Sequence, residues 1–179
     1  MKATGIVRRI DDLGRVVIPK EIRRTLRIKE GTSLEIYTDK EGEVILKKYS
    51  PIGELSAFAQ EYVDSLSLST KAISLICDRD AFIAASSGNK KIFAEKKISV
   101  ALDNIIANRK HVTSKDTNIE LSTEIDIDLP FKVISPIIAQ GDPIGAVLLV
   151  SKDNNVMDYD KASLLTQTGA IFLGKQMEQ

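Results

Sequence analysis

Cationic side chains gather near the start of the sequence at a spacing suited to binding an anion. Within "DDLGRVVIPKEIRRTLRI", which begins at Asp11, a basic residue recurs at i, i+3, i+4 and i+7, which predicts one charged face of a helix. These residues are Lys20, Arg23, Arg24 and Arg27. Like charges on one helical face repel one another by roughly 0.2–0.5 kcal/mol per close pair. An anion that relieves this repulsion is therefore the expected partner.

The surrounding segment enlarges this basic cluster. Residues 1–29 contain nine Lys and Arg against three Asp and Glu, a net charge of +6 in a chain whose net charge is zero. Outside the helical set, the cations of this segment are Lys2, Arg8, Arg9, Arg15 and Lys29. A solvated basic face without a partner is the alternative, but a local excess of this size favours an anionic partner.

Duplex DNA is the anion that best fits an arginine cluster of this kind. The guanidinium group presents a rigid fork of donors that matches phosphate, and it can also read guanine edges in the major groove. The basic helix is too short and too poor in aromatic or leucine surface to lie on a membrane. The cluster also has no aromatic residues on which unpaired RNA bases could stack. We therefore expect DNA binding and no membrane partner.

Short strands are predicted around these cations. Runs rich in β-branched residues, bounded by turn residues, predict strands at 4–10, 14–18, 33–38 and 43–48. About 50 residues with one short helix bury little apolar surface, and they contain no disulfide or zinc site to compensate. We therefore expect this segment to share its core with a second copy, as a homodimer.

The basic helix itself is predicted from its boundary residues. Pro19 suits the first helical position, where its missing N–H costs nothing. The helix should continue for about two turns and be stopped by Gly31. Ile22 and Leu26 would lie on the face opposite the cations and anchor the helix to the core.

A second helix is expected to begin after the boundary at Ser50–Pro51, with Ser50 as its N-cap. Its apolar residues follow coiled-coil spacing over two heptads. They are Ile52, Leu55, Ala59, Tyr62 and Leu66, with Phe58 and Val63 beside them. Packing onto its own domain is the first interpretation of this stripe, and a dimer-forming helix pair is the second. This helix, residues 51–68, joins an amino-terminal domain at 1–50 to a carboxyl-terminal domain at 69–179.

The carboxyl-terminal domain has a mixed pattern typical of an α+β fold. Two hairpins are predicted, one pairing 71–77 with 81–87 and the other 131–140 with 143–152. A helix is expected at 98–109, and residues 111–130 should be loop with a short strand. Asp158 can cap a final helix. On that helix one face is formed by Ala162, Leu165, Gly169, Phe172 and Leu173.

Residue types that could support catalysis or metal binding are sparse. His111 is the only histidine and has no neighbouring ligand, so it is interpreted as a loop residue, and Cys77 is expected to be a buried residue at a strand end. A local acidic group is interpreted as a solvated loop: Glu120, Glu124, Asp126 and Asp128. No EF-hand, Walker A or dinucleotide pattern occurs. We expect no enzyme, no metal and no cofactor.

The first 50 residues resemble a known family. "GRVVIPKEIRRTL", within a gapless match to residue 50, is similar to the AbrB-type swapped-hairpin DNA-binding domain of bacterial transition-state regulators. In that family two chains interleave their strands into one barrel, and arginines face DNA. The resemblance implies DNA contacts from Arg8, Arg15, Arg23 and Arg24, and phosphate contacts from Lys2, Arg9 and Lys20.

The rest of the chain extends the resemblance to sporulation-phase transcription regulators of spore-forming bacteria. It implies a GAF domain over roughly residues 54–178, a module that often holds a small molecule between its sheet and loops. "GDPIGAVLLVS" is similar to a late GAF hairpin, whereas the Asn-Lys-x-Phe-Asp motif of cyclic-nucleotide-binding members is absent. The expected role of this domain is assembly into a homo-oligomer, dimer or tetramer, and the sensing of an unidentified small molecule.

One other class of function remains open at this point. An antitoxin would use the same swapped-hairpin domain to neutralise a partner protein, but such proteins usually end in a short flexible tail, and here about 125 patterned residues follow. The absence of a bilayer-spanning apolar run, of a signal peptide and of paired cysteines favours a cytoplasmic protein, associated with the nucleoid if it binds DNA.

Overall fold

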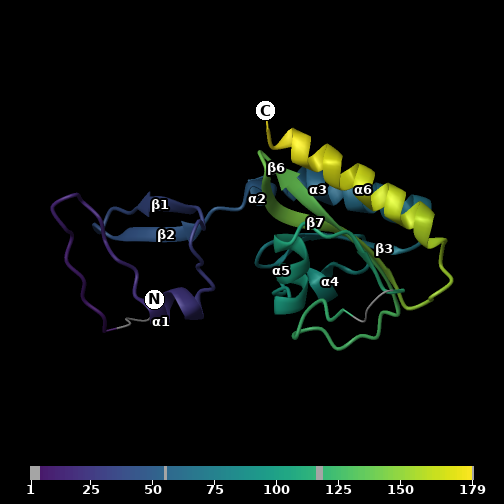
Figure 1. Ribbon diagram of the computed structural model, residues 1–179, viewed down its shortest axis with the longest axis horizontal. Coiled ribbons are helices and arrows are strands. Elements are labelled where there is room, and N and C mark those ends of the chain that lie inside the picture. Colours follow the sequence, from purple (N-terminus) through teal and green to yellow (C-terminus); the bar gives the residue numbers. More distant parts are fainter. Residues whose placement is uncertain (1–4, 55, 116–118, 179) are drawn as a thin grey trace. The chain divides into compact units, whose positions relative to one another are not determined.

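The computed structural model describes residues 5–54, 56–115 and 119–178. The chain forms two compact units, residues 1–49 and 50–179 (Figure 1). Among the described helices, none is long and apolar enough to cross a lipid bilayer.

The amino-terminal unit contains one short helix and one hairpin. Its elements are α1 (Lys20–Thr25), β1 (Leu34–Thr38) and β2 (Val44–Lys48). The two strands pair antiparallel, with Leu34 opposite Lys48 and Thr38 opposite Val44. In the turn between them, Asp39 Oδ1 accepts hydrogen bonds from the backbone N–H groups of Glu41 and Glu43 at 3.0 and 2.8 Å. The strands predicted at 33–38 and 43–48 are thus confirmed, and they form a hairpin.

The two strands predicted at 4–10 and 14–18 are not formed within the described part of one chain. Residues 5–10 and 15–19 have no strand assignment, and the chain only reverses direction between Asp11 and Arg15. A run of β-branched residues becomes a strand only when a neighbouring strand satisfies its backbone groups. Among the described residues of one chain, no strand pairs with either segment.

The basic helix is also shorter than predicted. Pro19 is its N-cap rather than its first residue, and α1 ends at Thr25. Leu26, expected to anchor the helix, is exposed and follows the last turn. Arg27 has a φ of +53°, a left-handed conformation that ends the helix four residues before Gly31.

The carboxyl-terminal unit is a five-stranded antiparallel sheet in the order β4-β3-β7-β6-β5. Its strands are β3 (Ile73–Asp78), β4 (Phe82–Ala85), β5 (Val112–Thr113), β6 (Phe131–Ala139) and β7 (Asp142–Ser151). Its helices are α2 (Pro51–Glu54), α3 (Ser56–Thr70), α4 (Lys90–Phe93), α5 (Val100–Ala107) and α6 (Tyr159–Gln176). Both predicted hairpins, the helix after residue 98 and the short strand within 111–130 are confirmed. Helix α4 was not predicted.

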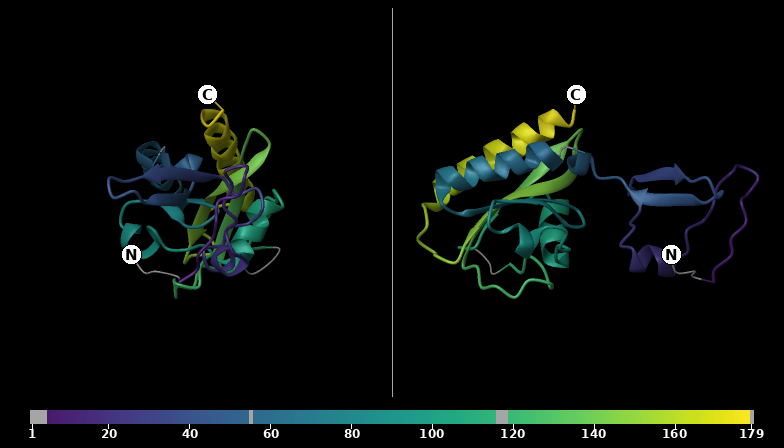
Figure 2. Two further views of the ribbon diagram at one scale, coloured as in Figure 1. Left: turned by 90° about the vertical axis from the view of Figure 1, so that its left-hand side faces the viewer. Right: turned by 180° about the vertical axis from the view of Figure 1, so that it is seen from behind.

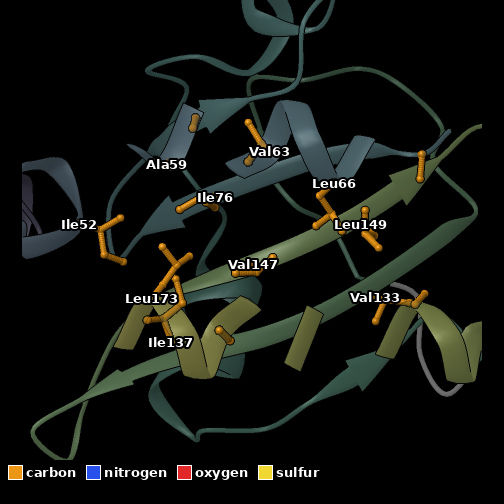
Figure 3. Close-up of a cluster of buried hydrophobic side chains, with 14 of the residues drawn as sticks. Ile52, Ala59, Val63, Leu66, Ile76, Val133, Ile137, Val147, Leu149 and Leu173 are labelled. Carbon is orange, nitrogen blue, oxygen red and sulfur yellow. The ribbon is translucent and has the colours of Figure 1, made fainter. Parts of the chain in front are cut away.

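Helices α3 and α6 lie side by side on one face of this sheet, and α4 and α5 lie on the other (Figures 1 and 2). The α3/α6 face buries one apolar cluster between helices and sheet (Figure 3). It includes Ile52, Ala59, Val63, Leu66, Ile76, Val133, Ile137, Val147, Leu149 and Leu173. The opposite face buries a second cluster around Phe82, Phe93 and Leu148 under α4, α5 and the segment 119–129. The sheet is therefore apolar on both sides.

The apolar stripe of the helix after Ser50 packs onto its own sheet, as the first interpretation predicted. Ala59, Val63 and Leu66 are buried against β3 and β4, and Ser50 caps the preceding turn by accepting the Gly53 N–H at 3.2 Å. Leu55 lies outside the described residues. Phe58 stays partly exposed, and its ring lies 5.8 Å from that of Phe172.

The final helix begins as predicted, but its inner face is shifted. Asp158 accepts hydrogen bonds from the N–H groups of Asp160 and Lys161. The buried positions of α6 are Ala162, Thr166, Gly169, Ala170, Leu173 and Gly174. Leu165 and Phe172, expected on that face, are exposed. Small residues line the inner side because α6 approaches β6 closely: a Cβ on Gly174 would overlap the carbonyl oxygen of Ile138.

Candidate nucleic-acid interface

The predicted DNA-contacting residues that the structure describes all have exposed side chains. They are Arg8, Arg9, Arg15, Lys20, Arg23, Arg24 and Arg27. Lys2, the eighth, lies outside the described residues. The seven belong to the amino-terminal unit and lie on the extended segment, at the turn, on α1 and, for Arg27, just after α1. A polyanion could reach each of them without any rearrangement of a core.

Helix α1 brings three of these cations together. Lys20, Arg23 and Arg24 stand at i, i+3 and i+4, which places them on one face. The Arg23 side chain is also held in place by a hydrogen bond, which its Nε donates to the carbonyl oxygen of Ile18 at 3.2 Å. Arg27 does not continue the face, because the helix has ended before it. The charged face therefore consists of three residues instead of the predicted four.

Arg15 has the most defined geometry of the set. Its Nε donates to Asp11 Oδ2 at 2.7 Å, and its backbone N–H donates to Asp11 Oδ1 at 2.7 Å. These two hydrogen bonds, the backbone one more strongly, lower the pKa of Asp11 from its ordinary value of 3.8. Asp11 is therefore ionised at neutral pH and forms an ion pair with Arg15. This role of Asp11 was not predicted from the sequence.

The amino-terminal unit has almost no core of its own. Among its described residues only Pro19 is buried. Its exposed large apolar residues are Ile6, Val7, Ile10, Leu13, Val16, Val17, Leu26, Ile36, Tyr37, Val44, Leu46 and Tyr49. So much exposed apolar surface beside a charged segment is typical of an interaction surface.

The remaining candidate residues have structural roles. Cys77 is fully buried, as predicted, and this burial raises the pKa of its thiol far above the ordinary value. His111 lies in a loop, as predicted, but it is half-buried and hydrogen-bonded. Its Nδ1 is 2.9 Å from Ser135 Oγ and its Nε2 is 3.0 Å from Ser163 Oγ. It thus ties the sheet to α6. Among the described residues, no cluster of His, Cys, Asp and Glu could hold a metal ion.

The described residues of the carboxyl-terminal unit line two pockets of interest, among others. The larger, of about 570 Å³, lies at the start of α6 and is lined by residues such as Ser114, Lys115 and Tyr159. The smaller, of about 200 Å³, lies between the sheet and the segment 119–129. It is lined by apolar side chains and by Glu120, Ser122, Asp128 and Lys132, and Lys132 is buried. This burial lowers the pKa of the Lys132 ammonium group, while Asp128 raises it.

An exposed cationic unit joined to an α+β unit is an organisation expected of a transcription regulator, and comparison with known proteins assigns the chain to that class. A family model described as "Stage V sporulation protein T C-terminal, transcription factor" matches residues 54–178. The chain belongs to the stage V sporulation protein T family. This is a family of transcription factors and not of enzymes. A second model, described as "Antidote-toxin recognition MazE, bacterial antitoxin", matches residues 7–54.

Individual relatives agree with this assignment. The chain is 54% identical to stage V sporulation protein T of Bacillus subtilis over 180 residues, with all of both chains covered. It is 67% identical to the transition state regulatory protein AbrB of the same organism over 51 residues, which is 28% of this chain and 52% of AbrB. The amino-terminal resemblance to the AbrB family is thus confirmed.

The fold of the carboxyl-terminal unit has a distant structural neighbour. A type II free methionine-R-sulfoxide reductase from Thermoplasma acidophilum aligns with 70% of this chain and 94% of its own, with a TM-score of 0.56. Sequence identity is 12%, so the likeness concerns the fold alone. It agrees with the predicted antiparallel sheet flanked by helices.

Proposed function

We propose that this transcription regulator binds duplex DNA through the exposed cations of its amino-terminal unit. The observation that carries the proposal is the exposure of seven Lys and Arg side chains within residues 8–27, three of them on one face of α1. Such side chains would neutralise phosphates and release counterions. The 67% identity with AbrB, one of whose solved structures is described as a DNA recognition domain, supports the same role. The site of action would be the nucleoid in the cytoplasm.

We further propose that two chains complete one amino-terminal barrel. Its extended segments, 5–10 and 15–19, would pair with strands of the second copy, as in the interleaved swapped hairpin expected from the sequence. The apolar side chains left exposed in one chain, such as Val7, Val17 and Ile36, would then form the shared core. A two-fold axis would duplicate the arginine cluster, which suits a roughly symmetric duplex.

The carboxyl-terminal unit is proposed to assist assembly and to accept a small molecule. The pocket of about 200 Å³ supports the second role, because apolar walls with a few polar groups, here Lys132 with Glu120 and Asp128, are typical of small-molecule sites. Binding would influence DNA affinity only if the molecule favoured one arrangement of the chains over another. Screening small polar metabolites for a rise in melting temperature tests this role, with Lys132→Met as the control that should respond less.

The central experiment is a salt titration of binding to duplex DNA. The logarithm of the affinity should fall linearly with the logarithm of salt concentration, with a slope of about 0.9 per neutralised phosphate. Replacing both Arg23 and Arg24 by Ala should weaken binding and flatten this slope while the oligomer persists. Binding identical to that of the parent would contradict the assignment of α1.

The antitoxin alternative is weaker. A relative that matches the chain over its full length is a sporulation protein, and the antitoxin model matches only residues 7–54. A small toxin that copurified with the protein and was released by competing DNA would revive it.

A further inference from the structure

The amino-terminal unit contains two turns of the same construction. In each, an Asp is followed after two residues by a Gly with positive φ: Asp11 with Gly14 at +74°, and Asp39 with Gly42 at +85°. Asp11 Oδ1 accepts the N–H groups of residues 13 and 15 at 3.0 and 2.7 Å. Asp39 Oδ1 accepts the equivalent N–H groups at 3.0 and 2.8 Å. One carboxylate oxygen is therefore sufficient to build either turn.

The two turns differ in the residue that follows the glycine. After Gly42 this residue is Glu43, whereas after Gly14 it is Arg15. The turn does not need the second carboxylate oxygen of Asp11, Oδ2, so this oxygen can bind the Arg15 side chain. It accepts Arg15 Nε at 2.7 Å. The Arg15 side chain stays 68% exposed even so, which leaves the guanidinium group accessible from solvent.

We propose that Asp11 is a positioning residue, which holds the guanidinium group of Arg15 ready for a phosphate or a guanine edge. The proposal rests on the proposed function, since it requires Arg15 to contact DNA. Immobilising a long side chain at an interface costs roughly 0.5–1.5 kcal/mol. If Asp11 fixes the Arg15 side chain before binding, the protein should bind DNA about two- to ten-fold more tightly than without this contact. In the described contacts, Asp11 binds the Nε of Arg15. The two terminal nitrogens of the guanidinium group are those that donate to a phosphate or to O6 and N7 of guanine.

Simple electrostatics predicts the opposite effect of Asp11 on DNA affinity. A carboxylate near a polyanion repels it, so removing the charge of Asp11 should tighten DNA binding if the side chain has no other role. If Asp11 positions Arg15, the same substitution should weaken binding. The two explanations are therefore separated by the direction of the change.

The experiment measures the affinity of the full-length protein for a short duplex selected for binding by the parent. Asp11→Asn keeps an oxygen that can accept both backbone N–H groups but presents no carboxylate to Arg15 Nε. Two variants are matched controls: Asp12→Asn removes a neighbouring charge, and Asp39→Asn makes the same change in the equivalent turn. We expect about two- to ten-fold weaker binding for Asp11→Asn. The two controls should bind as well as the parent or better.

A double-mutant cycle with Arg15→Ala completes the test. Asp11→Asn should change affinity little when Arg15 is already absent, because its effect acts through that side chain. An equal loss in both backgrounds would mean that Asp11 only maintains the turn, and tighter binding by Asp11→Asn would mean that it only repels DNA. Either result overturns the inference while leaving the proposed function intact. Unchanged binding by Arg15→Ala itself would instead contradict the proposed contact of Arg15 with DNA.

Discussion

The phenolic oxygen of Tyr62 lies directly over Gly169, so that a Cβ at residue 169 would overlap it. This contact occurs where α3 and α6 lie side by side on the sheet (Figure 1). Glycine is an unfavourable residue inside a helix, by about 1 kcal/mol relative to alanine. Its presence at the centre of α6 is explained by the space that Tyr62 occupies.

Gly169→Ala should therefore destabilise the carboxyl-terminal unit despite its better helix propensity. Overpacking costs typically about 1–3 kcal/mol, which outweighs or cancels the gain of about 1 kcal/mol from alanine. Tyr62→Phe removes the overlapping oxygen and should restore part of the loss in the double variant. Urea unfolding of the three variants measures both effects. A more stable Gly169→Ala protein would show that Tyr62 moves aside freely.

Gly145→Ala should be more damaging than Gly169→Ala. A Cβ at this position on β7 would overlap the backbone carbonyl of Cys77 on the paired strand, and also Ile52. A side chain such as Tyr62 can rotate, but a strand in the middle of a sheet cannot retreat without breaking its ladder. We expect a loss at or above the upper end of the overpacking range, about 3 kcal/mol. Equal stability of the two variants in urea would contradict this ranking.

The thiol of Cys77 should react only when the carboxyl-terminal unit opens. Burial raises its pKa and excludes reagents, so the thiolate is scarce at neutral pH. We expect a disulfide reagent that releases a coloured thiolate to modify Cys77 very slowly in the folded protein and rapidly in the urea-unfolded protein. Because Cys77 is the only cysteine, the signal needs no correction for other thiols. Prompt reaction of the folded protein would show that β3 is accessible.

The carboxylate of Asp11 should titrate below its ordinary pKa of 3.8. A lowered pKa in the folded state means that the ionised form stabilises the turn above pH 3.8, and that this contribution is lost as the pH falls through the lowered value. In Arg15→Ala the pKa should rise only part of the way, because the backbone N–H of residue 15 still donates to Oδ1. An NMR titration of the Asp11 side chain measures both values. An identical pKa in both proteins would mean that the ion pair is not formed in solution.

Local signals in the sequence predicted much of the carboxyl-terminal unit. Ser50 and Asp158 cap helices as expected, because a cap depends only on residues a few positions away. The strand hairpins were equally predictable from their turns. Helix α4 was missed because four residues are too few to show a periodic pattern. The partners of His111 could not be predicted, since Ser135 and Ser163 are 24 and 52 residues distant.

The amino-terminal unit was predicted less well from local patterns, for a different physical reason. The apolar residues of 5–10 and 15–19 show the right composition for strands, but composition does not state which chain supplies the neighbouring strand. The end of α1 depends on Arg27 entering a left-handed conformation, which glycine adopts far more readily. The cluster of exposed cations was evident from the sequence, whereas the hydrogen bond that fixes Arg15 to Asp11 required atomic positions.

The nearly coreless amino-terminal unit has a consequence for gene dosage. If two chains must meet before this unit can fold, its formation is a second-order reaction, and at low abundance the amount of competent regulator grows with the square of the copy number. A twofold rise in synthesis would then increase occupancy of promoters up to fourfold. Occupancy would then rise more steeply than the concentration of the regulator, without any further component.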